Sequence, residues 1–419
     1  MPRRPGSNER HERRSAVLAH RDLRRFLTGQ AASLLGDGMV GVALAFAVLD
    51  LTGSAADLGL VLAARSVPLV AVLLAGGVIA DRLPRRRVMV AADLGRVAGQ
   101  AVMAALLIGG HARVWELAVL QALHGTATAL FTPASTGLLP SLVPGDLLQH
   151  ANALRGLAAS AGNIAGPALA GVLVAATSPG WAIAADAATF AVSAALLAGL
   201  TAPARRRAAP RSVRRDLLDG WTEFRSRTWV WVVVAASFTA NALFAVFLVL
   251  GPAAVRDEAG GATAWAAIVA AFGTGSLLGG LAVLRHRPRR PLRAGMLAVA
   301  LFPLPTLGLA AHLPAVAVAA PALLGGAGLT VFNALWQTTL QRHVPDRALS
   351  RVSAYDWFGS LAGQPVGQAA AGPLAAGVGL HRALWLAGGV QVAAMLATLA
   401  VPAVRDLPAA EEPPSRELL

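Results

Sequence analysis

The chain has no cysteine and no lysine, and only 14% of its 419 residues are charged. Without cysteine the protein can form no disulfide, no thiolate metal site and no catalytic thiol. About a quarter of the residues of a soluble domain are charged, so the low charge argues against an ordinary soluble protein. The sequence also shows no phosphate-binding Walker loop, metal-ligand cluster or catalytic constellation. It therefore predicts no enzyme, no metal and no cofactor.

Long apolar stretches fill the chain instead. Hydrophobic residues make up 56% of it, and a membrane-spanning helix needs about 20 mostly apolar residues. We expect an all-α membrane protein with twelve transmembrane helices. The expected spans are 26–49, 57–80, 88–109, 114–137, 154–176, 181–200, 229–251, 264–284, 294–311, 315–338, 357–378 and 383–402.

Arginine marks one side of these spans. Thirty of the 36 basic residues, all of them arginine, lie before the first span, in alternate connecting segments or after the last span. Positive charge gathers in cytoplasmic segments, so we predict a multi-pass plasma-membrane protein with both termini in the cytoplasm. The same asymmetry explains the net charge of +14 without nucleic-acid binding. The expected partners are the lipid bilayer and a small-molecule substrate, and the protein is expected to be a monomer.

The chain divides into two similar halves. Val143-Pro144 and Gly166-Pro167 of the first half recur as Val344-Pro345 and Gly372-Pro373 in the second. A parallel duplication predicts two pseudo-symmetric six-helix halves with the substrate site between them. The expected parts are a cytoplasmic tail at 1–23, a half at 24–200, a linker with an amphipathic surface helix at 201–228, a half at 229–402 and a second tail at 403–419.

Tryptophans lie near the expected ends of the spans. Indole rings favour the headgroup level of a bilayer, so we expect two aromatic belts. The outer belt would contain Trp115, Trp181, Trp265 and Trp385, and the inner belt Trp229, Trp231 and Trp357.

The segment GVIADRLPRRR at 77–87 follows the second span. It resembles the loop signature of the major facilitator superfamily, although Pro84 stands where that family usually has glycine. The resemblance implies transport by alternating access and a cytoplasmic gate formed by Gly77, Asp81, Arg82, Arg85 and Arg86. In such a gate Asp81 would accept hydrogen bonds from the N-terminus of the eleventh span, where the helix dipole favours an anion. The other interpretation is a charged run that only sets topology.

The segment GNIAGPALAG at 162–171 lies in the fifth span. Its Gly162, Gly166, Pro167 and Gly171 resemble the antiporter signature of drug–proton exchangers in the same superfamily. Glycines four residues apart make a groove for another helix, and a proline inside a helix bends it. The resemblance implies export, whereas a general small-residue packing face is the other interpretation.

Further segments of the first half are similar to one exporter branch of this superfamily. They are Gln30, SLLGD at 33–37, DLTGS at 50–54, Pro68 and DLGR at 93–96. The branch contains macrolide-type drug exporters and the enterobactin exporter. The similarity implies fold and transport, and it leaves the substrate open.

Charged residues inside apolar spans are costly, which makes them functional candidates. Asp37 lies near mid-membrane, and Arg65 of the next span could be its counter-charge. Asp37 could carry the exchanged proton, or the two residues could form a structural pair. Asp93 and Arg96 lie one helical turn apart and are expected to form an internal pair. Asp93, Arg96 and Asp186 are further proton-coupling candidates.

Uncharged polar residues inside the spans are candidates for the substrate cavity. His124 lies one turn from Gln121, and it could line a cavity or pack between helices. Asn241 is the second-half counterpart of Asp37. The full set of cavity candidates is Gln121, His124, Asn241, Asn333, Trp336, Gln337, Gln364 and Gln368.

These features predict a secondary transporter that uses the proton gradient to export amphipathic small molecules. A drug, a secondary metabolite or a siderophore would fit. A nutrient or metabolite importer of the same fold is the closest alternative. A lipid scramblase or a sensor is more remote, because the sequence shows no catalytic group and no output domain.

Overall fold

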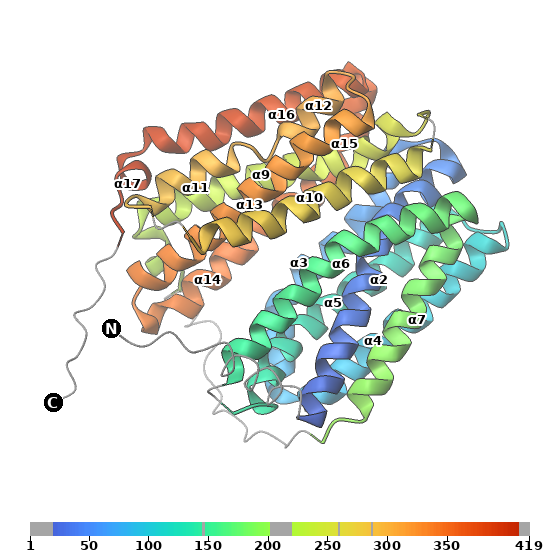
Figure 1. Ribbon diagram of the computed structural model, residues 1–419, viewed down its shortest axis with the longest axis horizontal. Coiled ribbons are helices and arrows are strands. Elements are labelled where there is room, and N and C mark those ends of the chain that lie inside the picture. Colours follow the sequence, from blue (N-terminus) through green and yellow to red (C-terminus); the bar gives the residue numbers. More distant parts are fainter. Residues whose placement is uncertain (1–19, 145–146, 202–219, 259, 286–287, 410–419) are drawn as a thin grey trace. The chain divides into compact units, whose positions relative to one another are not determined.

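A computed structural model describes residues 20–144, 147–201, 220–258, 260–285 and 288–409 (Figure 1). Within its helices, the side chains of 73–82, 149, 346–347 and 350 are outside the description. All regular secondary structure in the described residues is helical. Residues 1–19 and 410–419 of the predicted tails and residues 202–219 of the predicted linker lie outside the described residues.

Six long helices make up the first half of the chain. They are α2 (Arg21–Thr52), α3 (Ala55–Arg82), α4 (Arg85–Ile108), α5 (Val114–Leu138), α6 (Leu148–Ala176) and α7 (Pro179–Ala198), with the short η1 (Leu139–Ser141) after α5. The breaks between them fall at glycine and proline. Gly53 ends α2 in a left-handed conformation with φ 67°, which glycine adopts without steric cost.

The second half repeats this plan with two of its spans divided. Its helices are α9 (Thr228–Val255), α10 (Gly261–Val283), α11 (Pro291–Val299), α12 (Leu304–Ala310), α13 (Ala315–His343), α14 (Asp346–Leu361), α15 (Gly363–Val378) and α16 (Leu380–Ala397), followed by η3 (Thr398–Ala400) and α17 (Pro402–Arg405).

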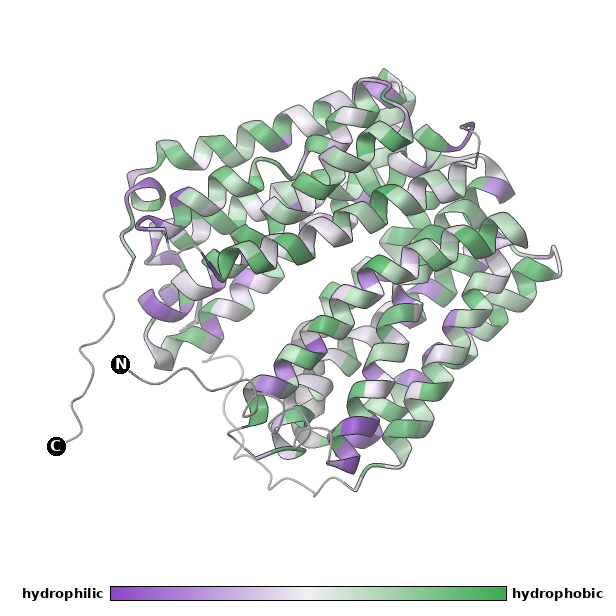
Figure 2. Ribbon diagram, in the orientation of Figure 1, coloured by the Kyte–Doolittle hydropathy of each residue, from purple (hydrophilic) through white to green (hydrophobic). Residues whose placement is uncertain are grey.

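Ten stretches of the described chain are long and apolar enough to cross a membrane, with α11 and α12 counted as one. Figure 2 shows hydrophobic residues along most of the helices, with hydrophilic residues frequent at helix ends. The other two expected spans correspond to α5 and to α14 with α15. The expectation of a many-spanning, all-helical membrane protein is therefore confirmed.

Proline explains where two expected spans are interrupted. The span expected at 294–311 is divided between α11 and α12, and Pro303 and Pro305 lie at this break. The span expected at 357–378 starts earlier, at Asp346, and is divided after Leu361, four residues before Pro365. A proline nitrogen donates no hydrogen bond to the carbonyl four residues earlier. The structure thus corrects both boundaries.

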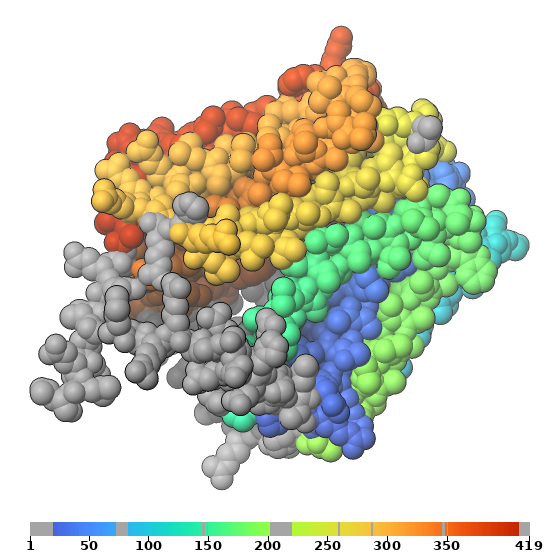
Figure 3. Space-filling view, in the orientation of Figure 1, coloured from blue at the N-terminus to red at the C-terminus, as the bar shows by residue number. Residues whose placement is uncertain are grey.

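Contacts divide the chain into two compact units. The first consists of Met1–Ala209 with Val255–Ala270, and the second of Pro210–Ala254 with Ala271–Leu419. On the face that Figure 3 presents, α6, α2 and α7 of the first unit lie side by side.

Close helix contacts recur in equivalent places in the two units. In the first, a Cβ on Gly166 of α6 would lie 2.7 Å from the Cα of Gly38 on α2. In the second, a Cβ on Gly367 of α15 would overlap the carbonyl of Ala242 on α9. Both contacts join the first and fifth spans of a half, as an internal duplication requires.

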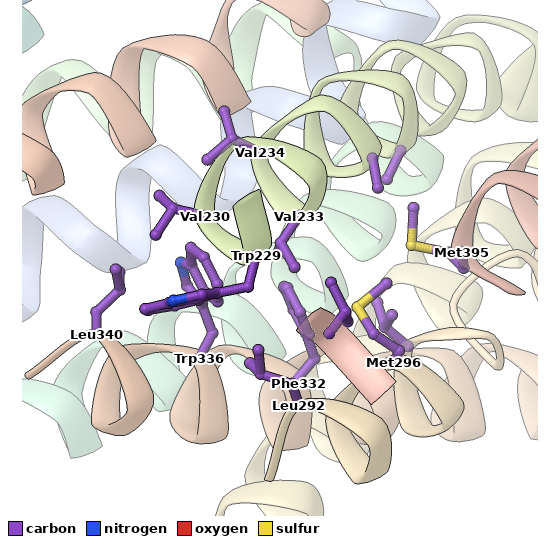
Figure 4. Close-up of a cluster of buried hydrophobic side chains, with 14 of the residues drawn as sticks. Trp229, Val230, Val233, Val234, Leu292, Met296, Phe332, Trp336, Leu340 and Met395 are labelled. Carbon is purple, nitrogen blue, oxygen red and sulfur yellow. The ribbon is translucent and has the colours of Figure 1, made fainter. Parts of the chain in front are cut away.

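The second unit has a hydrophobic core that contains several large side chains, and Figure 4 shows part of it. Trp229 is 8% exposed and lies in this core, and Trp265 of the first unit is 2% exposed. Neither ring can reach lipid headgroups, so their assignment to the aromatic belts is wrong. A tryptophan at a helix end can lie either in the apolar core of the protein or at the membrane–water interface, and its position in the sequence does not distinguish these two locations.

Candidate functional site

Polar and charged side chains from five helices of the first unit gather in an otherwise apolar bundle. Their helices are α2, α3, α4, α5 and α7. The members of this polar cluster are Asp37, Arg65, Asp93, Arg96, Gln100, Gln121, His124, Asp186, Thr189 and Ser193.

Asp37 is held by two side chains from neighbouring helices. Arg65 Nη2 lies 3.1 Å from Asp37 Oδ1, and His124 Nε2 lies 3.3 Å from the same oxygen. The glycine after His124 allows this geometry, because a Cβ on Gly125 would overlap the carbonyl of Arg65. The structure thus brings together the pair that the sequence suggested and adds His124 to it.

Asp37 is also the most accessible carboxylate of the cluster. Its side chain is 27% exposed and that of Arg65 is 24% exposed. Asp93 and Asp186 are fully buried, with 0% of their surface exposed. A proton or a substrate therefore reaches Asp37 with the least rearrangement.

Asp93 and Arg96 form the expected internal pair on α4. Arg96 Nη1 lies 3.3 Å from Asp93 Oδ1, and Ser193 Oγ donates to Asp93 Oδ2 at 2.7 Å. The Arg96 guanidinium lies over the rings of Phe131 and Phe190, at 4.6 and 4.9 Å from their centroids. Such cation–π contacts stabilise a charge where water is absent.

Asp186 has only neutral partners. Gln100 Nε2 donates to Asp186 Oδ2 at 2.6 Å, and Thr189 Oγ1 lies 3.5 Å from Asp186 Oδ1. Within the described residues it forms no ion pair. Three carboxylates therefore face two guanidinium groups in this cluster. With His124 neutral, one bound proton makes the cluster electrically neutral, which a low-dielectric site favours.

Several buried atoms of the cluster lack a hydrogen-bond partner. They are Arg96 Nε, Gln121 Oε1 and His124 Nδ1. Gln121 also makes a long 3.8 Å contact to the sulfur of Met103. Buried polar atoms are nearly always satisfied in proteins, so these groups mark where water or a ligand can bind.

The glycine–proline helix α6 packs closely on α2. A Cβ on Gly162 would lie 2.7 Å from the carbonyl oxygen of Leu34. A Cβ on Gly171 would lie 2.5 Å from the Cβ of Ala266, which belongs to the first unit. The helix continues through Pro167. Gly162, Gly166 and Gly171 thus occupy close helix contacts, whatever further role this segment has.

The predicted cytoplasmic gate is described only in part. The side chains of Gly77, Asp81 and Arg82 lie outside the described residues. Arg85 donates to the carbonyl of Gly137 at the end of α5. Arg86 donates to the carbonyls at the end of α7, where the helix dipole favours a cation.

The second-unit cavity candidates do not form a comparable cluster. Asn241 bonds its own helix at the carbonyl of Ser237, and Asn333 is exposed. Gln337 and Gln364 are half-buried. Gln368 is 5% exposed, and its Oε1 lacks a partner.

Trp336 takes part in the second unit's hydrophobic core. It is 4% exposed and lies 5.6 Å from the Trp229 ring in an edge-on arrangement. Its indole nitrogen donates to Asp356. Packing and this hydrogen bond are the contacts that the structure gives to Trp336.

Sequence reasoning missed Gln100, Thr189 and Ser193, although a signal for Gln100 and Ser193 was present. Gln100 follows Asp93 by seven residues on α4, and Ser193 follows Asp186 by seven on α7. Residues seven apart share one face of a helix. Asp93 and Asp186 therefore each had a polar companion on their own helix face.

Comparison with known proteins decides the family. A family model described as Major Facilitator Superfamily matches residues 26–363. The chain belongs to the major facilitator superfamily. As a member of that superfamily it is a multi-pass membrane protein and a secondary transporter of small molecules, not an enzyme.

The similar superfamily proteins include named exporters. The chain is 30% identical over 409 residues to "Multidrug efflux pump Tap" of Mycolicibacterium fortuitum, covering 90% of this chain and 95% of that protein. It is 30% identical over 145 residues to "Macrolide efflux protein A" of Streptococcus pyogenes, covering 35% and 36%. The crystal structure of the nucleoside transporter NupG matches with a TM-score of 0.71 at 15% identity, covering 90% of this chain and 98% of that one. The last likeness concerns the fold.

Proposed function

We propose that this transporter exports amphipathic small molecules, such as a drug, a secondary metabolite or a siderophore, in exchange for protons. The observation that carries the proposal is the carboxylate of Asp37, which meets Arg65 and His124 in an otherwise apolar bundle. The names of two similar proteins, a multidrug efflux pump and a macrolide efflux protein, support export.

The polar cluster supplies the chemistry of coupling. A charged carboxylate at this depth is stable while Arg65 lies 3.1 Å away. When helix movement separates the pair, Asp37 becomes costly as an anion and takes up a proton. Exchange follows if the substrate binds to the deprotonated cluster and the proton binds to the empty one, because the two ligands then alternate.

The orientation and the gate complete the proposal. The arginine-rich segments and both termini lie in the cytoplasm, in the plasma membrane, and the protein works as a monomer. The parts of the chain are the tails 1–23 and 403–419, the halves 24–200 and 229–402, and the linker 201–228. Asp81 closes the cytoplasmic side, while Arg85 and Arg86 hold the ends of neighbouring helices.

Transport by the purified protein tests this proposal. The protein is reconstituted into liposomes, and fluorescent dyes, macrolides and siderophores are offered with and without an imposed pH gradient. We expect a substrate to accumulate against its gradient only on the acidic side of the membrane, because protons leave that side as the substrate enters it. Accumulation that ignores the pH gradient would refute proton exchange. Movement of substrate in the same direction as the proton would favour the importer.

A further inference from the structure

The second unit contains a buried carboxylate that lies outside the polar cluster. Asp356 on α14 is 5% exposed. Trp336 Nε1 on α13 donates to Asp356 Oδ2 at 3.1 Å, and the hydroxyl of Ser360, one turn further along α14, is a second donor. Both donors are neutral.

Within the described residues Asp356 forms no ion pair. Helices α9 and α15 carry no ionisable side chain. The ionisable groups on the other elements around it are Arg342 and His343 of α13, Asp346, Arg347, Arg351 and Tyr355 of α14 itself, and Glu223 and Arg225 of the helical residues 220–225.

The Trp336 side of the pair is closely packed. The Trp336 ring packs on Trp229, and the ring of Phe332 lies parallel to it at 6.3 Å (Figure 4). A buried carboxylate with only neutral donors is costly as an anion. A proton removes that cost.

We propose that Asp356 is a proton-binding site of the second unit. It holds a proton while α13 and α14 are packed together, and it releases the proton when water reaches the Asp356–Trp336 pair. The proposal goes beyond proton exchange at the polar cluster, because it adds a titratable site in the other half of the chain.

The position of Asp356 gives this proton a structural consequence. Its neighbour Tyr355 packs on the rings of Trp221 and Phe224, both at 5.7 Å. These two rings belong to the end of the segment that joins the two halves. A movement of α14 therefore changes its contact with that segment. Protonation of Asp356 favours the arrangement in which α13 and α14 are packed together.

Infrared spectroscopy of the full-length protein in lipid nanodiscs tests the proposal. A protonated carboxylic acid has a carbonyl stretch that a carboxylate lacks. We expect the spectrum of wild type minus that of Asp356→Asn at neutral pH to contain such a band, whereas a proton held by the polar cluster contributes to both spectra and cancels. The exposed Asp257 provides a control, and Asp257→Asn should keep the band. If Asp356→Asn removes only carboxylate absorption, the proposal is overturned.

A second variant keeps the test decisive if Asp356→Asn does not fold. Trp336→Phe retains an aromatic ring and removes the indole donor. The carbonyl band of a protonated Asp356 should then move to higher frequency, because the acid has lost a hydrogen bond. An unchanged acid band in Trp336→Phe would contradict the assignment to Asp356.

Spin labels test the link between the proton and helix packing. The cysteine-free chain accepts a label pair at the exposed residues Gln341 on α13 and Ala354 on α14. Their separation should grow at alkaline pH in wild type and stay short in Asp356→Asn. A control pair at the exposed Leu278 and Leu324 should not respond. The same pH response in Asp356→Asn would refute the proposal, whatever the outcome of the transport experiments.

Discussion

Gly36 on α2 leaves the space that the carboxylate of Asp186 on α7 occupies. A Cβ at position 36 would overlap Asp186 Oδ1 and the hydroxyl of Thr189. The residue next to Asp37 therefore determines how closely a second carboxylate approaches it. Asp37 and Asp186 lie on helices far apart in the sequence, and they share one site because Gly36 has no side chain to fill the space between α2 and α7.

Gly36→Ala should displace the Asp186 carboxylate and impair transport. Overpacking of this kind costs about 1–3 kcal/mol, which thermal unfolding in detergent measures. Gly41 is the matched control on the same helix, because a Cβ there meets nothing within 4 Å. Equal effects of Gly36→Ala and Gly41→Ala would show that the close approach at Asp186 is unimportant.

Asp37→Asn should abolish accumulation driven by a pH gradient. Asparagine keeps the shape of the side chain but cannot exchange a proton, and it leaves Arg65 without its counter-charge. Substrate binding to the purified variant should remain, whereas the exposed-site variant Asp257→Asn should transport normally. If Asp37→Asn still concentrates substrate, Asp186 or Asp93 carries the coupled proton and Asp37 is structural.

Arg86→Ala should destabilise the end of α7. The guanidinium donates to the carbonyls of Leu197 and Ala198, and loss of these contacts should cost about 1 kcal/mol. Arg87 is exposed and gives the control, since Arg87→Ala removes an equal charge from the same turn. Matching melting temperatures for the two variants would mean that the arginine run contributes only charge.

Cysteine labelling tests the predicted topology in this cysteine-free chain. Single cysteines at Ala208 and Arg405 should resist an impermeant maleimide in intact cells and react after lysis. His111→Cys, in a predicted external segment, should react in intact cells. Labelling of position 208 without position 405, or the reverse, would exclude an even number of spans in the second half.

The fold could be predicted because the thickness of the bilayer sets the length of each span and because arginine gathers in the segments on the cytoplasmic side. The polar cluster was predictable only in part. A charge in an apolar span is visible in the sequence, and so Asp37 and Arg65 were found. The contact of Gln100 with Asp186 was not predicted, because it depends on which faces of α4 and α7 meet.

The tryptophans show the same limit. Trp115 and Trp229 both lie at helix ends, and one is 60% exposed while the other is 8% exposed. Hydropathy indicates how far a residue lies from the end of a span. Whether its side chain is buried depends on which neighbouring helix packs against that face. Pro303 and Pro365 lack the backbone N–H that continues a helix, which is a signal for the two breaks. The breaks were not predicted because the apolar stretches run without interruption across both prolines.

Backbone contact between helices has a consequence for motion. Where α6 meets α2 at Gly166 and Gly38, the surfaces in contact are main-chain atoms. Such a seam has no side-chain rotamers to rearrange when one helix slides along the other. One helix could therefore slide along the other at this contact without a change of side-chain conformation. A single added methyl group at either glycine would obstruct that movement.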